Sequence, residues 1–105
     1  MKIQLILDAV RSHRLRISDH ADEEATNDGL GLDFILASIE RGEIIEDYPD
    51  DTPYPSCLVL GWDSTGRPIH SVWAYDESSA WVVLVTVYAP DPTRWVNWRE
   101  RRPRS

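Results

Sequence analysis

The stretch SCLVLGWDSTGRPIHSVWAYDESSAWVVLVTVY, residues 56–88, decides the fold of this 105-residue chain. It holds three runs rich in β-branched and aromatic residues, which favour strands: residues 56–62, 68–75 and 80–88. The turn sequences DSTG and DESS separate them, and Gly66 fits a turn position that needs a positive φ. Three strands joined by short links predict an antiparallel meander.

Residues 43–48, with the sequence EIIEDY, predict a fourth strand ahead of this stretch. A loop rich in proline and aspartate, residues 49–55, joins it to the meander. The expected fold class is therefore α+β, with two to three N-terminal helices packed on one face of a four-stranded antiparallel sheet. We expect residues 1–105 to form a single domain that ends in a basic tail, residues 96–105.

Three helical segments are expected before the strands. The first ends near His13, because apolar residues recur there at helical spacing: Ile3, Ile6, Leu7 and Val10. Residues 15–17 form an extended link, and Ser18 or Asp19 can then cap a second helix that stops by residues 27–29. A third helix starts at about Leu32, and Gly42 is expected to end it in the left-handed conformation.

Composition excludes several classes of protein. The formal net charge of −7 argues against broad binding to nucleic acid, because phosphate neutralisation supplies most of that affinity. Cys57 is the only cysteine, which excludes an intrachain disulfide and a cysteine-based zinc cluster. No apolar run approaches the roughly 20 residues of a membrane span, and we expect no secretory signal, because the apolar stretch at residues 1–6 is too short for one. We expect a cytoplasmic protein without a metal or other cofactor.

The charge is unevenly distributed along the chain. Acidic residues concentrate between positions 19 and 51, whereas arginines crowd the last dozen positions: Arg94, Arg99, Arg101, Arg102 and Arg104. A basic end beside an acidic body can bind RNA locally or an acidic partner chain. The alternative is a solvated terminus with frayed structure.

Two histidines are candidates for proton transfer, because the histidine pKa lies near neutral pH. His20 lies among acidic residues at the start of the second helix, and His70 lies in the third strand. Alternation in the last strand places Thr86 and Tyr88 on one face with Val82 and Leu84. Depending on the loop of the last hairpin, His70 pairs with Val85 or with Thr86, and a one-residue slip exchanges the two faces.

Three stretches together resemble the domain of unknown function 4258 family. They are SDHA at residues 18–21 with Glu23, residues 42–76 (GEIIEDYPDDTPYPSCLVLGWDSTGRPIHSVWAYD), and VTVYAPDPTRW at residues 85–95. The resemblance covers about residues 17–95, and the order of the motifs is specific. It implies a RelE/barnase-like fold and kinship with small bacterial toxins that cleave RNA without a metal and pair with an antitoxin.

The resemblance also implies which residues form the site. His20 and His70 match the family's helix and strand histidines, and Thr86 and Tyr88 match the hydroxyl pair of the last strand. These four are the expected catalytic residues. The expected substrate-binding residues are Arg67, Tyr75, Arg94 and Trp95, of which Trp95 matches the family's closing aromatic.

The chain departs from the family pattern at one position beside His20. Many members carry arginine where this chain has Glu24, so phosphate binding should be weaker here, with Arg67 or the C-terminal arginines compensating. Two functions follow. One is a toxin-like, metal-independent endoribonuclease of a toxin–antitoxin pair, and the other is a non-catalytic relative that acts as a protein-binding module. The expected partners are RNA, an antitoxin protein or a second copy of the chain, but no membrane.

Overall fold

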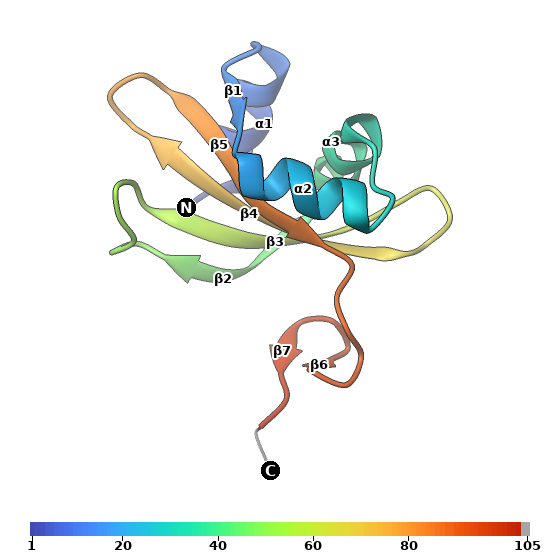
Figure 1. Ribbon diagram of the computed structural model, residues 1–105. Coiled ribbons are helices and arrows are strands. Elements are labelled where there is room, and N and C mark those ends of the chain that lie inside the picture. Colours follow the sequence, from blue (N-terminus) through green and yellow to red (C-terminus); the bar gives the residue numbers. More distant parts are fainter. Residues whose placement is uncertain (104–105) are drawn as a thin grey trace.

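The predicted meander forms the centre of the sheet in the computed structural model, which describes residues 1–103 (Figure 1). Its strands are β3 (Ser56–Trp62), β4 (Pro68–Asp76) and β5 (Trp81–Tyr88), and they pair antiparallel, as does the expected fourth strand, β2 (Glu43–Tyr48), at the edge beside β3. Gly66 has a φ of 85° in the β3–β4 turn, which confirms the role expected for this glycine. The α+β class is thus confirmed.

The sheet has five strands and is mixed, so the expectation of four antiparallel strands was wrong. The link at residues 15–17 is a strand, β1 (Leu15–Ile17), that pairs parallel with β5 in the order β1-β5-β4-β3-β2. His13 turns the chain with a φ of 60° after α1 and sets the link along the free edge of β5. Three residues are too few to show the alternation by which strands are found.

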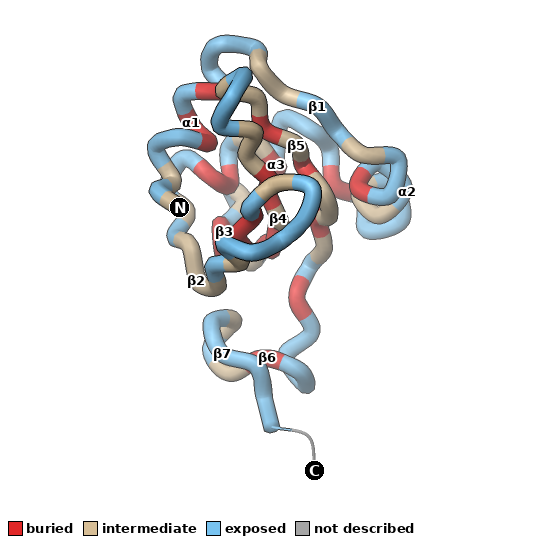
Figure 2. The backbone as a smooth tube through the Cα atoms, turned by 90° about the vertical axis from the view of Figure 1, so that its left-hand side faces the viewer, coloured by how far each residue is buried: buried red, intermediate tan, exposed pale blue. Residues whose placement is uncertain are grey.

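Three helices pack on one face of the sheet: α1 (Ile3–Arg11), α2 (Asp19–Asn27) and α3 (Leu32–Glu40). Their buried side chains meet those of the strands in one core, which includes Ile6, Ala21, Ile35 and Trp73 (Figure 2). Ser18 caps α2, because its Oγ accepts a hydrogen bond from the amide of Ala21 at 3.0 Å.

The ending expected for the third helix was wrong. Gly42 is absent from the positive-φ residues of the described chain, and α3 ends at Glu40 with Arg41 as its C-cap. Glycine is needed at position 42 for another reason. A Cβ atom there would lie 2.8 Å from Cγ1 of Val59, so glycine lets the chain pass close to β3.

A β-bulge at Val85 sets the two faces of β5. Val72 pairs with Thr86 and Trp73 with Leu84, which leaves Val85 without a partner. The face expected from simple alternation was therefore wrong: Leu84 faces the helices, whereas Thr86 and Tyr88 share the opposite face with His70. His70 pairs with Tyr88, so neither register considered from the sequence was correct.

The C-terminal residues fold into a hairpin on the face away from the helices (Figure 1). Its strands are β6 (Trp95–Val96) and β7 (Glu100–Arg101), and it contacts His70 and Glu46. The alternative of a frayed terminus is thus wrong up to residue 103, and Arg104 lies outside the described residues. None of the helices in residues 1–103 is long and apolar enough to cross a membrane.

Candidate functional site

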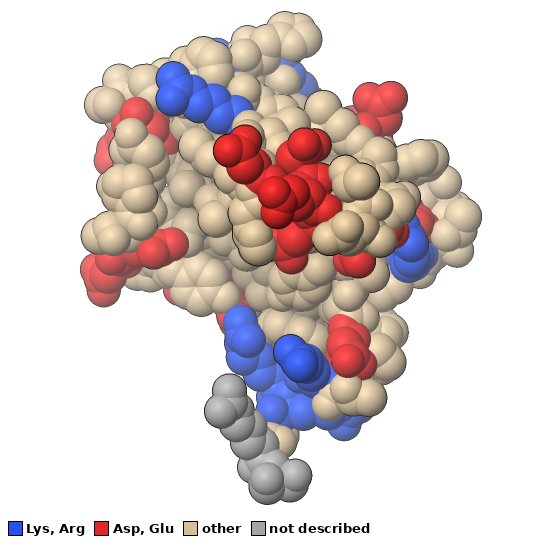
Figure 3. Space-filling model, in the orientation of Figure 1, with Lys and Arg blue, Asp and Glu red and all other residues tan. Residues whose placement is uncertain are grey.

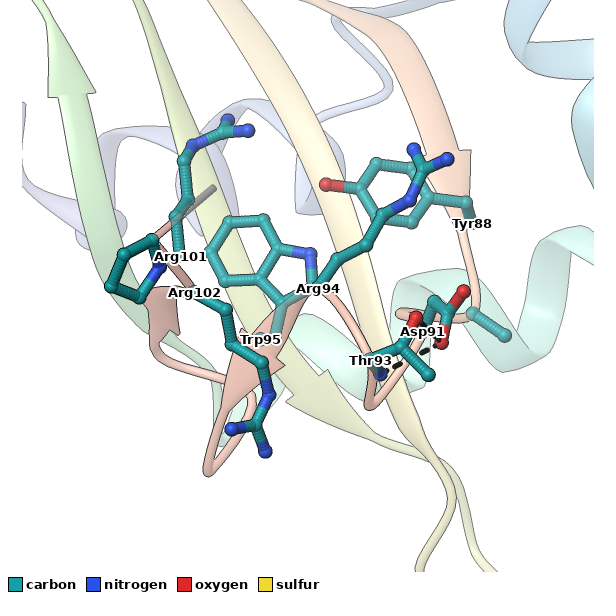
Figure 4. A pocket seen from close by; sticks show the side chains of 9 residues that line it. Tyr88, Asp91, Thr93, Arg94, Trp95, Arg101 and Arg102 are labelled. Atoms are coloured by element: carbon teal, nitrogen blue, oxygen red, sulfur yellow. Dashed lines mark hydrogen bonds between the residues drawn. The ribbon is translucent and has the colours of Figure 1, made fainter. Parts of the chain in front are cut away.

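A cleft of about 970 Å³ lies between the end of β5 and the C-terminal hairpin (Figure 4). We call it the arginine cleft, since three arginines line it together with two aromatic residues. Its lining residues are Tyr88, Ala89, Asp91, Thr93, Arg94, Trp95, Arg101, Arg102 and Pro103. Side chains of this kind suit an anionic ligand, because guanidinium groups bind phosphate oxygens in pairs.

Hydrogen bonds within residues 91–102 fix the wall of the cleft. One carboxylate oxygen of Asp91 accepts from the amide and from the hydroxyl of Thr93, both at 2.8 Å. These two bonds hold the pKa of Asp91 below its ordinary value. Arg102 donates its amide to the carbonyl of Arg94 and its Nε to the carbonyl of Pro92, each at 2.8 Å.

The charges of the molecule are separated between two ends. Figure 3 shows acidic side chains gathered over α2 and arginines gathered over the C-terminal hairpin. The net charge of −7 therefore hides a local basic surface. Such a surface attracts polyanions at short range even when the whole molecule is acidic.

His70 lies beneath the hairpin and is fully buried. Its Nε2 lies 2.7 Å from the carbonyl oxygen of Trp98, and its Nδ1 lies 3.2 Å from the hydroxyl of Tyr88. Because a carbonyl oxygen only accepts, Nε2 carries the proton and Nδ1 accepts from Tyr88 when the ring is neutral. The ring of Trp95 meets the imidazole edge to face, with centroids 4.5 Å apart.

Burial dominates the ionisation of this pair. It lowers the pKa of His70, although the Trp98 carbonyl and the charge of Glu46 act in the opposite direction. Burial likewise raises the pKa of the Tyr88 hydroxyl. At neutral pH the pair is therefore an uncharged imidazole that accepts a hydrogen bond from an uncharged phenol, and Tyr88 also lines the arginine cleft.

The hairpin is tied to β2 by an ion pair that we call the latch. Nε and an Nη of Arg101 lie 3.1 Å from the two carboxylate oxygens of Glu46, and the hydroxyl of Tyr48 donates to the same carboxylate. Burial acts to raise the pKa of Glu46, but the bonds from Arg101 and Tyr48 outweigh it and lower that pKa. Burial, and then the bond to Glu46, raises the pKa of Tyr48 to about 12.

His20 lies in a different setting, on the exposed surface of α2. Its Nε2 is 2.7 Å from Oε1 of Glu24, and the same carboxylate oxygen accepts from the hydroxyl of Thr86. Ser18 fixes this end of α2, because its Oγ donates to the carbonyl of Val85 in the bulge at 2.8 Å. Glu24 is therefore a hydrogen-bond acceptor that links His20 to the sheet.

The structure brings some of the expected site residues together and separates others. Tyr88, Arg94 and Trp95 line the cleft, and His70 lies directly behind the two aromatic rings. His20 and Thr86 do not line the cleft; they are joined to each other through the carboxylate of Glu24.

Two expected substrate-binding residues lie elsewhere. Arg67 belongs to the β3–β4 turn, where its Nε is 3.1 Å from Asp63. Tyr75 packs against the core on the helix side of the sheet, because it pairs with Val82 beyond the bulge. Neither residue lines the cleft.

Sequence reasoning missed the residues that close the site. Glu46 and Tyr48 were predicted only to lie in a strand. The contact of the Trp98 carbonyl with His70 could not be predicted, because every residue has a backbone carbonyl. A spacing of two places Glu46 and Tyr48 on one face of β2, which could have indicated a polar pair on the sheet. Within residues 1–103 no group of three metal-ligating side chains converges.

Comparison with known proteins gives one match. The family model described as a domain of unknown function (DUF4258) matches residues 17–89, which is well over half of the chain and includes α2, α3 and the strands β2 to β5. No curated protein and no solved structure matches the chain.

Proposed function

The chain belongs to the DUF4258 family, and from this premise we propose that it is a toxin-like, metal-independent endoribonuclease of a toxin–antitoxin pair with a RelE/barnase-like fold. The observation that carries the proposal is the arginine cleft beside Tyr88, whose hydroxyl contacts His70. A phosphate site next to a proton-transfer group is what RNA cleavage without a metal requires.

The reaction needs two proton transfers. A base removes the proton of the 2′-hydroxyl, the 2′-oxygen attacks phosphorus, and the bond to the 5′-oxygen breaks as an acid protonates it. His20 and His70 are the proposed pair, with the hydroxyls of Thr86 and Tyr88 donating to the phosphorane oxygens. Arg94 and Arg102 hold the flanking phosphates from the cleft wall.

Glu24 reduces the affinity of this site for RNA. A phosphate brought near His20 meets the Glu24 carboxylate, and at 6 Å with an effective dielectric of about 20 the two repel by up to roughly 3 kcal/mol before salt screening. The proposed activity is therefore weak. Replacing Glu24 with arginine should strengthen it, despite the loss of the bonds to His20 and Thr86.

A cleavage assay without metal tests the proposal. The parent protein, incubated with RNA and a chelator, should cleave weakly, while Glu24→Arg cleaves faster and His20→Ala and His70→Ala do not cleave. Arg94→Ala should also slow cleavage, and Arg67→Ala is its matched control because Arg67 lies outside the cleft. Equal rates for the parent, Glu24→Arg and both histidine variants would refute the ribonuclease.

A second candidate is the non-catalytic protein-binding module, with an antitoxin or a second copy as partner. It is favoured by the exposed apolar side chains of Ile17 and Leu32, which line a small groove between α2 and α3, and by the exposed ring of Phe34 on α3. The tryptophans give weaker support to a binding module than these side chains do, because Trp73 and Trp95 are buried and Trp62 alone of the five is exposed. Sedimentation of the parent and of Phe34→Ser tests for self-association, which the variant should weaken.

A further inference from the structure

We propose that the β6–β7 hairpin is a cover over His70, latched by Arg101 and Glu46, which single-stranded RNA in the arginine cleft opens. This inference rests on the proposed function and adds its regulation. In this proposal the structure is the closed state, in which the hairpin covers His70.

The first support is the complete occlusion of His70. The side chain is fully buried, and both ring nitrogens have protein partners, the Trp98 carbonyl and the Tyr88 hydroxyl. An imidazole in this state can neither reach an RNA atom nor exchange a proton with it, because a proton-transfer group must come within hydrogen-bond distance. The hairpin has to move before His70 can act.

The second support is the small number of contacts that hold the cover. Its strands have two residues each, and two ion pairs join it to β2: Arg101 with Glu46, and Arg99 with Glu43 at 2.6 Å. Both arginine side chains are largely exposed, and ion pairs at a protein surface contribute little to stability. The buried ring of Trp95 is the main apolar anchor.

The third support is the backbone of the hairpin turn. Asn97 and Trp98 have φ values of 51° and 65°, in the left-handed region that a bulky residue such as tryptophan rarely adopts. This unusual conformation brings the Trp98 carbonyl to Nε2 of His70. A strained turn held by a contact to a titratable group is typical of a segment with two states.

The position of Arg101 couples ligand binding to opening. Its guanidinium group belongs to the latch and also lines the arginine cleft, where it lies 4.8 Å from the ring of Trp95. A phosphate in the cleft competes with Glu46 for this group. RNA therefore binds the open state better than the closed one, which is the condition for a ligand to shift such an equilibrium.

The chemistry of the uncovered surface favours single strands. Opening frees the faces of Trp95 and His70, and unpaired bases stack on aromatic rings beside arginines. Bases in a duplex are already stacked inside the helix and cannot use this surface.

The test measures access to His70 rather than cleavage. Diethyl pyrocarbonate modifies accessible neutral imidazoles, and mass spectrometry reports the rate at His70. The probe is a 2′-O-methyl oligonucleotide, which lacks the attacking hydroxyl and cannot be cleaved, with its binding followed by fluorescence anisotropy. We expect slow modification of His70 in the free protein and modification about tenfold faster with the oligonucleotide bound, the change that corresponds to the loss of a charge-assisted bond.

Two variants isolate the latch. Glu46→Gln should speed the modification of His70 without any ligand, whereas Glu77→Gln, the same change on an exposed residue of the β4–β5 turn, should not. Circular dichroism shows whether Glu46→Gln is folded, and the parent with its oligonucleotide tests the cover independently. Binding that leaves His70 protected overturns the cover and the catalytic role of His70, and metal-free cleavage by the parent protein then decides separately whether the chain is a ribonuclease. Absence of binding overturns both the cover and the ribonuclease.

Discussion

His20 and His70 are residues of one type that occupy opposite environments. His20 stands on a helix with 69% of its side chain exposed and contacts one carboxylate, Glu24. His70 is 0% exposed, contacts a carbonyl and a phenol, and lies under a hairpin. The surface around His20 is acidic, and the surface beyond His70 is lined with arginines (Figure 3).

The difference teaches that the pKa and the accessibility of a histidine depend on strand register and on which distant segments pack over it, and not on residue type alone. Burial lowers the pKa of His70 and shields it from ligands. The bulge at Val85 turns Thr86 and Tyr88 away from the face of Leu84 and onto the face of His70, where the Tyr88 hydroxyl contacts His70 and the Thr86 hydroxyl contacts Glu24.

The largest effect is expected for Trp95→Ala, which removes the apolar part of the cover. The ring is buried against His70 and Arg101, so the variant should lose about 3 kcal/mol of unfolding free energy, the lower end for a buried tryptophan. Urea unfolding measures it. Trp62→Ala is the control, because Trp62 is exposed, and a similar loss in both variants would contradict the closed hairpin.

The next effect is a pH dependence of stability that comes from His70. Because burial lowers its pKa below 6.5, the unfolded chain binds this proton at higher pH than the folded chain. The stability contributed by neutral His70 is complete above about pH 6.5 and falls toward the folded-state pKa, by at most about 1.4 kcal/mol per pH unit. Its charged or titratable neighbours are Glu46, Arg101 and Tyr88.

These neighbours do not titrate in the same window. The pKa of Glu46 is lowered from its ordinary acidic value, and those of Tyr88 and Arg101 are raised from ordinary values that already lie well above neutral pH. Unfolding measured in urea between about pH 7 and about pH 5 should therefore show a loss of stability in the parent that is smaller in His70→Gln. Parallel curves for the two proteins would show that His70 is not buried in solution.

A smaller effect is expected where Thr86 meets α2. Thr86→Val removes the hydroxyl that donates to Glu24, and should cost about 1 kcal/mol of stability, the usual net value of one hydrogen bond. Thr86→Ser keeps the donor and should retain most of that stability. Equal thermal unfolding of the two variants would mean that the link between His20 and the sheet does not form.

The smallest effect concerns the salt dependence of RNA binding. Removing one phosphate contact from a single-stranded complex lowers the slope of log affinity against log salt by about 0.7. Arg102→Gln should show this decrease with a 2′-O-methyl oligonucleotide, and Arg67→Gln should keep the parent slope, because its side chain is held by Asp63 away from the cleft. The reverse order would move the RNA site to the β3–β4 turn.

The sequence by itself determined the features that depend on near neighbours. The bounds of β2 and β3, the turn at Gly66 and a helix cap at Ser18 or Asp19 were all predicted, because alternation, turn chemistry and capping act over a few residues. The family motifs also pointed to Tyr88 and Trp95, and the concentration of arginines near the end of the chain pointed to Arg94; the structure brings these three residues to one cleft.

Tertiary structure alone decided how these pieces meet. The pairing of β1 with β5, the bulge at Val85 and the hairpin over His70 join segments far apart in the chain, and no local pattern encodes them. Because Val85 is unpaired, Thr86 lies on the opposite face of β5 from Leu84. The contact between the Trp98 carbonyl and Nε2 of His70 covers the histidine. Register and cover depend on the free energy of the whole fold, so they emerge only when distant segments pack.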